Sequence, residues 1–226
     1  MINSKYTIIV RVEITTLLSP DGRVSRKKLD RLAMAITNLF NSGKNVIIVS
    51  SGAIVLGSEK LNLSQLPFTQ VDMQATAAVG QAELMRYYQQ YFAEYNQLVA
   101  QVLLTSDIIS YPQRVINTRN TFQTLLNMGI IPVVNENDPV STADIDIDDN
   151  YPLARIVAQI SMADFIAIKM EINGNYLVIP KGSNNGIIVN NETEFQEKIE
   201  SMCHVMNIEN NICEAIFPAS IGDIIF

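Results

Sequence analysis

The sequence has few of the residues that cross-link small domains or bind metals. Only two cysteines, Cys203 and Cys213, occur in 226 residues, and the one histidine is His204. This set offers neither a disulfide framework nor a zinc site, so we predict inert thiols and no structural metal. Charged residues are also scarce, at 17% against 48% hydrophobic residues, so no segment is polar enough to stay unfolded. A single domain over residues 1–226 is expected, with a core that needs no cross-link.

Positive charge and long apolar runs are also lacking. The 16 lysines and arginines face 23 aspartates and glutamates, which gives a net charge of -7. A nucleic-acid footprint needs clustered positive charge, so nucleic acid is excluded as a partner, and the basic run at residues 23–31 is interpreted as a solvated helix face. Arg11 and Glu13 interrupt the apolar stretch at residues 6–18, which excludes a signal peptide or a membrane span there. We therefore expect a cytoplasmic protein with no membrane partner.

Short β-branched runs alternate with longer amphipathic stretches along the chain. Strands are predicted at residues 6–12, 45–49, 98–104, 130–134, 165–170 and 176–179. Helices are predicted at residues 26–41, 74–95, 114–127 and 153–161, where apolar residues recur at spacings of three and four. Gly43 and Gly129 follow two of these helices and are suited to the left-handed conformation that closes a helix. The alternation is typical of βαβ units, so we predict an α/β fold with a mainly parallel sheet covered on both faces.

Small polar residues follow the predicted strand at residues 45–49. They are Ser50, Ser51 and Gly52, and a short helix is expected after them. Ligands of open parallel sheets bind beyond the carboxyl ends of the strands, where small residues expose backbone N–H groups to an anion such as a carboxylate. An ordinary serine–glycine turn has the same residues, so this segment alone does not decide between a binding site and a turn.

A cluster of amides and carboxylates follows the strand at residues 130–134. Its members are Asn135, Glu136, Asn137 and Asp138. Asp138 is suited to hold an ammonium group while the amides orient a carboxylate, although a capped acidic turn has a similar composition. A second acidic stretch at residues 144–149 has the wrong spacing for a calcium loop, so no metal site is predicted there.

Five segments, in order and spacing, resemble glutamate 5-kinases of the amino-acid kinase family. They are VSSGA at 49–53, AAVGQ at 77–81, QVLLT at 101–105, RNT at 119–121 followed by LL at 125–126, and PVVNEND at 132–138. The resemblance implies a three-layer αβα sandwich and phosphorylation of the side-chain carboxylate of L-glutamate by ATP with Mg²⁺, the first step towards proline. It also implies that Ser51, Asp138 and Asn150 bind glutamate.

The chain differs from this family at the end of the first predicted strand, where the phosphates of ATP are expected to bind. Family members leave the strand through a lysine and a glycine, where this chain has Arg11 and Glu13. Arg11 keeps the positive charge and is the candidate catalytic residue, but a planar guanidinium differs in shape from a compact ammonium. Glu13 adds a negative charge where polyphosphate should lie, which costs on the order of several kcal/mol in a partly desolvated site.

Three further segments differ from the family on the nucleotide side. Tyr151 replaces the second aspartate of the family's Gly-Asp-Asn-Asp stretch, and Met170-Glu171 replaces a threonine–aspartate pair, which leaves Glu171 as the candidate nucleotide-binding residue. The glycine-rich segment that carries a second catalytic lysine has no counterpart after residue 176, and neither does the RNA-modification-type domain that follows some members. The domain is therefore expected to be shortened in its nucleotide-binding part.

Three readings of the function follow. The sequence favours a glutamate 5-kinase homologue with impaired catalysis, a pseudokinase that acts as a glutamate-binding or regulatory subunit in proline biosynthesis. The first alternative is an active, truncated glutamate 5-kinase that uses Arg11 and another cation with MgATP. The second alternative is a structural partner without a small-molecule ligand. The resemblance also implies a homo-oligomer, or a hetero-oligomer with an active paralogue.

Overall fold

A mixed sheet forms the centre of the protein. The structure is a computed structural model that describes residues 6–65, 69–141, 150–169, 175–183, 185–191, 193–195, 197–199 and 201. Within these residues the sheet has seven strands, in the order β3-β4-β2-β1-β5-β6-β7. The strands are β1 (Thr7–Val12), β2 (Asn45–Ser50), β3 (Leu98–Leu104), β4 (Ile130–Glu136), β5 (Phe165–Lys169), β6 (Tyr176–Pro180) and β7 (Ile187–Val189). The first five are parallel, and β6 and β7 add antiparallel strands at one edge.

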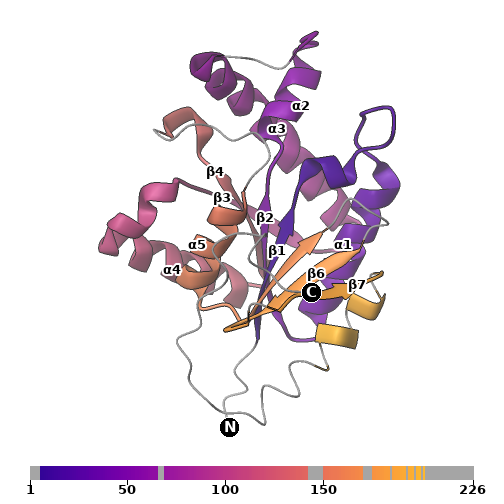
Figure 1. Cartoon of the computed structure of the whole chain (residues 1–226), viewed down its shortest axis with the longest axis vertical. Helices are drawn as coiled ribbons and strands as arrows, with labels where there is room; N and C mark the ends of the chain where they lie inside the picture. Colours follow the sequence, from indigo (N-terminus) through magenta and orange to yellow (C-terminus); the bar gives the residue numbers. More distant parts are fainter. Residues whose placement is uncertain are drawn as a thin grey trace.

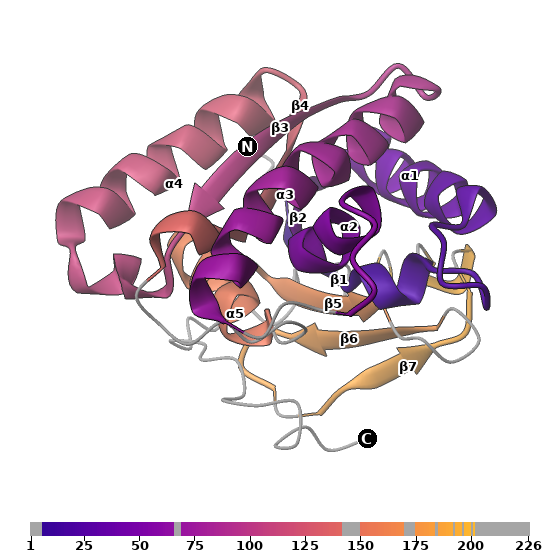
Figure 2. The same ribbon diagram turned by 90° about the horizontal axis from the view of Figure 1, so that it is seen from above.

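Helices cover both faces of this sheet. They are α1 (Arg26–Asn41), α2 (Ala53–Lys60), α3 (Gln70–Ala93), α4 (Pro112–Asn127) and α5 (Tyr151–Ser161), with short 3-10 turns η1 (Ile14–Leu17), η2 (Ser106–Ser110) and η3 (Asp138–Val140). Figures 1 and 2 show α1 and α3 on one face and α4 and α5 on the other. The predicted α/β sandwich with a mainly parallel sheet is confirmed.

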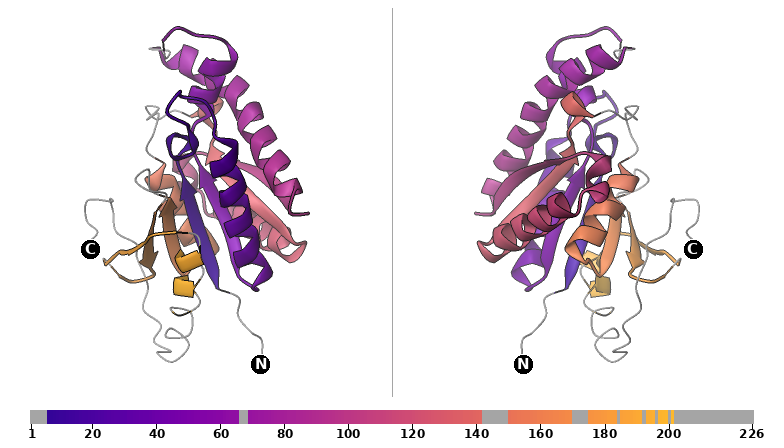
Figure 3. Two further views of the ribbon diagram at one scale, coloured as in Figure 1. Left: turned by 90° about the vertical axis from the view of Figure 1, so that its right-hand side faces the viewer. Right: turned by 90° about the vertical axis from the view of Figure 1, so that its left-hand side faces the viewer.

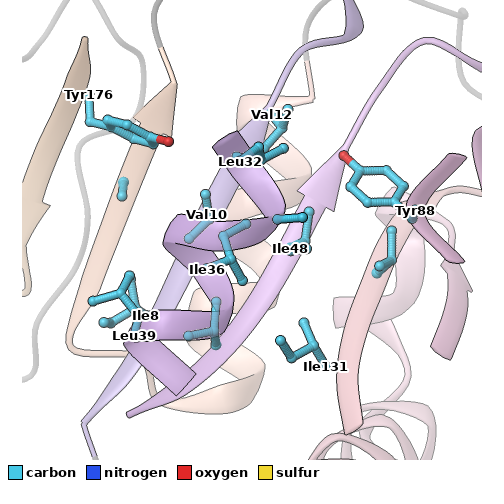
Figure 4. Close-up of a cluster of buried hydrophobic side chains, with 14 of the residues drawn as sticks. Ile8, Val10, Val12, Leu32, Ile36, Leu39, Ile48, Tyr88, Ile131 and Tyr176 are labelled. Carbon is cyan, nitrogen blue, oxygen red and sulfur yellow. The ribbon is translucent and has the colours of Figure 1, made fainter. Parts of the chain in front are cut away.

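The central strands β1, β2, β4 and β5 are buried on both faces because a helix layer covers each side. Ile8 and Val10 of β1 pack into the cluster beneath α1 and α3, whereas Ile9 packs into the cluster beneath α4 and α5. Figure 4 shows the first cluster, where Leu32 and Ile36 of α1 face these strands. Continuous β-branched strands of this kind are typical of parallel sheets with two covered faces.

The helix boundaries differ from the prediction mainly at their starts. The helix α3 begins at Gln70 rather than residue 74 because the hydroxyl of Thr69 accepts a hydrogen bond from the backbone N–H of Asp72 at 3.2 Å. Gly43 and Gly129 have φ values of +87° and +77° and follow α1 and α4, as predicted. The basic run at residues 23–31 lies at the start of α1, and its lysines and arginines are exposed to solvent, as predicted.

Two glycines bring α2 against α3 at the end of the molecule beyond the carboxyl ends of the parallel strands (Figure 3). A Cβ atom on Gly80 of α3 would lie 1.7 Å from the carbonyl oxygen of Ala53, and one on Gly57 of α2 would lie 2.0 Å from that of Thr76. Only glycine permits this approach, so α2 is held in one position directly after β2.

Across the described residues, no helix combines the length and apolar character needed to cross a membrane.

Candidate active site

The predicted site residues lie at one edge of the sheet, where β4, β2 and β1 end side by side. Parallel pairing aligns Arg11 with Val49 of β2, and Val49 with Val134 of β4. Ser51 follows β2 directly, and Asp138 follows β4 after one residue. Asn150 precedes α5, which packs beneath β1. The fold therefore places the substrate residues predicted from the sequence and the predicted cation at the same edge.

Arg11 is a buried cation at the next-to-last position of β1. Its side chain lies on the α5 side of the sheet, because the neighbouring Val10 and Val12 pack on the other face. Arg11 is 2% exposed, and its Nε atom donates a hydrogen bond to Oδ1 of Asn150 at 2.8 Å. One of its Nη atoms forms an ion pair with the carboxylate of Glu13. The negative charge that Glu13 adds after β1 is thus paired with the positive charge of Arg11.

Asn150 occupies the position before α5 but does not cap the helix with its side chain. The side chain turns to Arg11 instead, while the backbone carbonyl of Asn150 accepts from the N–H of Ala154 at 2.9 Å. Asn150 is 7% exposed, and its Nδ2 atom has no hydrogen-bond partner among the residues that the structure describes. A buried amide donor without a partner costs free energy, so this group is suited to bind an acceptor on a ligand.

Ser51 is another buried polar group at this edge whose side chain has no partner among the described residues. Its backbone N–H donates to the carbonyl of Val12 at 3.1 Å, which fixes the residue beside β1. The side chain is 6% exposed, and its hydroxyl has no partner in the described part of the chain. The next residue, Gly52, has φ +103°, and a Cβ there would lie 2.2 Å from Cγ2 of Ile14. Gly52 is therefore required by the packing of Ile14, a reason that the sequence alone did not reveal.

Asp138 begins the short turn η3 beside α3 and is 9% exposed. Burial raises the pKa of its carboxyl group to about 6, an effect opposed only by a hydrogen bond from its own backbone N–H. A buried carboxylate without a cation is unfavourable, and a ligand ammonium group would stabilise its charged form. The role that the resemblance implies for Asp138 stays a prediction.

The rest of the β4 exit is held by side-chain hydrogen bonds. Asn135 donates through Nδ2 to Oε1 of Gln81 at 2.8 Å, which uses one of the two N–H donors of its amide. Glu136 accepts from the backbone N–H of Ser106 at 3.2 Å and from the hydroxyl of Ser141 at 3.3 Å, and burial raises its pKa. These contacts hold Asn135 and Glu136 in place, and the orientation of a ligand carboxylate by the amides stays a prediction.

Two buried side chains near this edge were not assigned a site role from the sequence. Lys169 ends β5, is 4% exposed, and its Nζ atom lies 4.2 Å from the centre of the Tyr176 ring. Lys169 could have been noticed in the sequence because it is a lysine within an otherwise apolar predicted strand. Tyr151, which replaces a family aspartate, is 1% exposed and belongs to the core beneath α5. Glu171, the acidic stretch at 144–149, and Cys203, His204 and Cys213 lie outside the described residues.

A sequence profile described as "Amino acid kinase family" matches residues 15–188 of the chain. The chain belongs to this family. It is 43% identical to the glutamate 5-kinase of Enterococcus faecalis over 196 residues, which are 85% of this chain and 72% of that protein. It is 40% identical to the glutamate 5-kinase of Listeria welshimeri over 204 residues, 88% of this chain and 74% of that one. The chain is thus a homologue of glutamate 5-kinases.

Solved structures of other kinases have the same fold. A carbamate kinase from Giardia superposes with a TM-score of 0.53 and 13% identity, over 74% of each chain. An isopentenyl phosphate kinase superposes with a TM-score of 0.52 and 13% identity, over 74% of this chain and 73% of the other. These similarities confirm the architecture of the sandwich.

Proposed function

We propose that this amino acid kinase is a glutamate 5-kinase, which transfers the γ-phosphate of ATP to the side-chain carboxylate of L-glutamate. In this step a carboxylate oxygen forms a new P–O bond while the bond to ADP breaks, and the products are an acyl phosphate and ADP. The attacking carboxylate is already ionised at neutral pH, so the reaction needs no general base. Catalysis then depends on positioning and on cations around the transferred phosphoryl group.

The contact between Arg11 and Asn150 is the observation that carries this proposal. The resemblance assigns Asn150 to glutamate and Arg11 to the phosphate, and the two side chains are joined at 2.8 Å. The orphan Nδ2 of Asn150 and the orphan hydroxyl of Ser51 are suited to the carboxylates of glutamate, and Asp138 is suited to its ammonium group. The glutamate carboxylate that accepts the phosphoryl group and the guanidinium of Arg11 would thus lie close together at the end of β1.

The nucleotide and its metal ion would bind at the same edge, because the phosphate must reach the carboxylate. Among the described residues, no group of three histidine, cysteine, aspartate or glutamate side chains is arranged to hold a metal ion. Mg²⁺ would therefore be bound mainly by the phosphates of ATP, as Mg²⁺ commonly is in kinases. We propose that Glu171 contacts the nucleotide, as the resemblance implies.

A second candidate is a glutamate-binding protein with impaired phosphoryl transfer, and the ion pair between Arg11 and Glu13 favours it. The carboxylate of Glu13 competes with the phosphates of ATP for the guanidinium of Arg11, and it also repels the phosphates. A structural partner without a ligand is less well supported, because it leaves the buried polar groups of Ser51 and Asn150 without a use.

Assembly into oligomers is part of the proposal. Edge strand β3 and helix α4 carry exposed apolar side chains, which a second subunit would cover. They include Leu98, Ile116 and Met128, at 67%, 48% and 67% exposure. Light scattering after size-exclusion chromatography tests this point, since a monomer at micromolar concentration would contradict it.

Direct detection of the product tests the proposed activity. The purified protein is incubated with MgATP, glutamate and hydroxylamine, which converts the acyl phosphate to a stable hydroxamate. Calorimetric titration with glutamate alone is run in parallel. Hydroxamate that requires both substrates supports the kinase. Glutamate binding without hydroxamate supports the second candidate, and the absence of both contradicts both.

A further inference from the structure

A cavity of about 450 Å³ lies at the edge of the sheet opposite to the candidate active site. It is formed where β1 and β2 begin, under helix α4 and beside the end of α5, and its lining includes Thr7 and Asn45. In Figure 1 this is the lower end of the sheet, near the amino-terminal part of β1. Arg11 lies four residue steps beyond Thr7 in β1, which is about 13 Å along a strand. The cavity is therefore distinct from the site proposed for phosphoryl transfer.

Two side chains of opposite charge line this cavity without pairing with each other. Arg119 of α4 uses its Nε atom to donate to the carbonyl of Ile160 at 2.8 Å, and its Nη atoms have no acceptor among the described residues. Asp164 accepts a hydrogen bond from the backbone N–H of Thr7 at 2.8 Å through one carboxylate oxygen. Neither side chain forms an ion pair within the described part of the chain.

The environment of the carboxylate favours a positively charged partner. Asp164 is only partly exposed, and burial raises its pKa, while its backbone hydrogen bond and the charge of Lys181 lower it. No salt bridge to Lys181 is formed, so the carboxylate keeps capacity for a second donor. The hydrogen bonds to Ile160 and Thr7 hold both charged groups in place before any ligand arrives.

The rest of the lining is mainly polar, with two apolar side chains of α4 that present little surface to the cavity. Phe122 and Leu126 of α4 are 1% and 7% exposed and line the same cavity. Cavities of this volume with a few fixed polar groups are typical of small-molecule sites. The two Nη atoms of Arg119 present a fork that matches a carboxylate.

We infer that this cavity is a binding site for a free α-amino acid, for which L-leucine and L-phenylalanine serve as probes. The carboxylate of the ligand binds the Nη atoms of Arg119, and its ammonium group binds Asp164. The RNT segment at residues 119–121 thereby has a role at this site, remote from phosphoryl transfer. The inference does not depend on kinase activity.

Calorimetric titration with L-leucine and L-phenylalanine tests the inference on the full chain. Leucinamide lacks the carboxylate and 4-methylpentanoate lacks the ammonium group, so each should bind at least about tenfold more weakly than leucine. Arg119→Gln and Asp164→Asn should weaken leucine binding by a similar factor. Arg114→Gln is the matched control, because Arg114 lies on the same helix, exposed and outside the cavity, and should bind leucine as the wild type does.

Chemical-shift mapping of the wild type gives an independent readout if a variant fails to fold. Leucine should perturb the amide signals of Thr7, Asn45 and Gln123, and Ser51→Ala should bind leucine unchanged. The absence of binding by both amino acids at millimolar concentrations would overturn the inference. Equal binding of leucine, leucinamide and 4-methylpentanoate, or shifts confined to the surroundings of Ser51, would overturn it too.

Discussion

The side chain of Arg11 donates a hydrogen bond from Nε to Oδ1 of Asn150 at 2.8 Å, across 139 residues of sequence. The bond joins the end of β1 to the start of α5. It also orients the amide of Asn150, because an oxygen that accepts from Arg11 leaves Nδ2 as a donor for another acceptor. A guanidinium has five N–H donors, so Arg11 can hold Asn150 and Glu13 together, which the three donors of a lysine ammonium on a flexible stem do with less precision.

Replacement of Glu13 by glutamine should make phosphoryl transfer faster. The variant removes the negative charge that pairs with Arg11, so the guanidinium becomes available to the phosphates. We expect kcat/KM for MgATP to rise about tenfold at saturating glutamate, as is reasonable for the loss of one like charge. Initial rates of ADP release measure this. Glu59→Gln, on an exposed side chain of α2, is the control, and an unchanged or lower rate in Glu13→Gln would contradict the assigned role of Glu13.

Replacement of Ser51 by alanine should weaken glutamate binding without loss of stability. Its buried hydroxyl has no partner among the described residues, so its removal breaks no hydrogen bond in the free protein. A hydrogen bond to a charged ligand contributes about 1.5–3 kcal/mol, so the Kd of glutamate should rise about tenfold or more.

The hydroxyl of Ser58 provides a control for this effect. It is equally buried and also without a described partner, but it lies within α2 rather than at the sheet edge. Calorimetry should give the same Kd for Ser58→Ala as for the wild type. A similar weakening in both variants would indicate an indirect effect on α2.

The affinity for glutamate should fall as the pH drops through about 6, because burial raises the pKa of Asp138 to about 6. Below that pH the protonated carboxyl no longer attracts the ammonium group of glutamate. Calorimetric titrations should therefore give a Kd about tenfold higher at pH 5 than at pH 7.5. The Kd of Asp138→Asn should be higher throughout and independent of pH in this range, and a wild-type Kd that stays constant would count against the assignment.

The same carboxyl should reduce stability at neutral pH. A folded-state pKa above the unfolded value contributes stability at low pH, and that contribution is lost as the pH rises through about 6. We expect Asp138→Asn to raise the free energy of unfolding at pH 7.5 by on the order of 2 kcal/mol, and by less at pH 5. Urea unfolding at both values measures this, with the exposed Asp21→Asn as control.

Replacement of Gly80 by alanine should separate α2 from α3. The added Cβ would lie 1.7 Å from the carbonyl oxygen of Ala53, so the helices must move apart. We expect a loss of about 2 kcal/mol or more in the free energy of unfolding, together with weaker glutamate binding, because α2 follows Ser51 directly. Gly43→Ala is a control for glycine removal, since a Cβ there has open space, although its φ of +87° carries strain. Equal stability of Gly80→Ala and the wild type would contradict the packing.

Much of the fold was predictable because its signals are local. The β-branched strands and the apolar spacing of the helices led to β1 to β6 and to the order of elements, and the resemblance led to the sandwich. The start of α3 was missed because the capping hydroxyl of Thr69 lies before the apolar pattern begins. The prediction of a single domain over the whole chain stays a prediction.

Less of the candidate site than of the fold could be predicted from the sequence. Family motifs named Ser51, Asp138 and Asn150, and the structure places them at one edge, while their binding roles stay predictions. The contacts of Arg11 with Asn150 and Glu13 were not predictable, because they depend on which face of β1 the side chain takes and on a helix 139 residues later. Loss of catalysis was inferred from single replacements, whereas the ion pair shows that two of them, Arg11 and Glu13, interact.

The most direct test of the central claim is the initial rate of glutamate-dependent ADP release by the wild type and by Arg11→Met. Circular dichroism confirms folding of the variant, and Arg11→Lys serves as the conservative replacement. We predict ADP release that requires glutamate, a loss of about 100-fold or more in Arg11→Met, and partial activity in Arg11→Lys. A wild type without glutamate-dependent ADP release, or an Arg11→Met variant as fast as the wild type, would contradict a phosphotransferase built around Arg11.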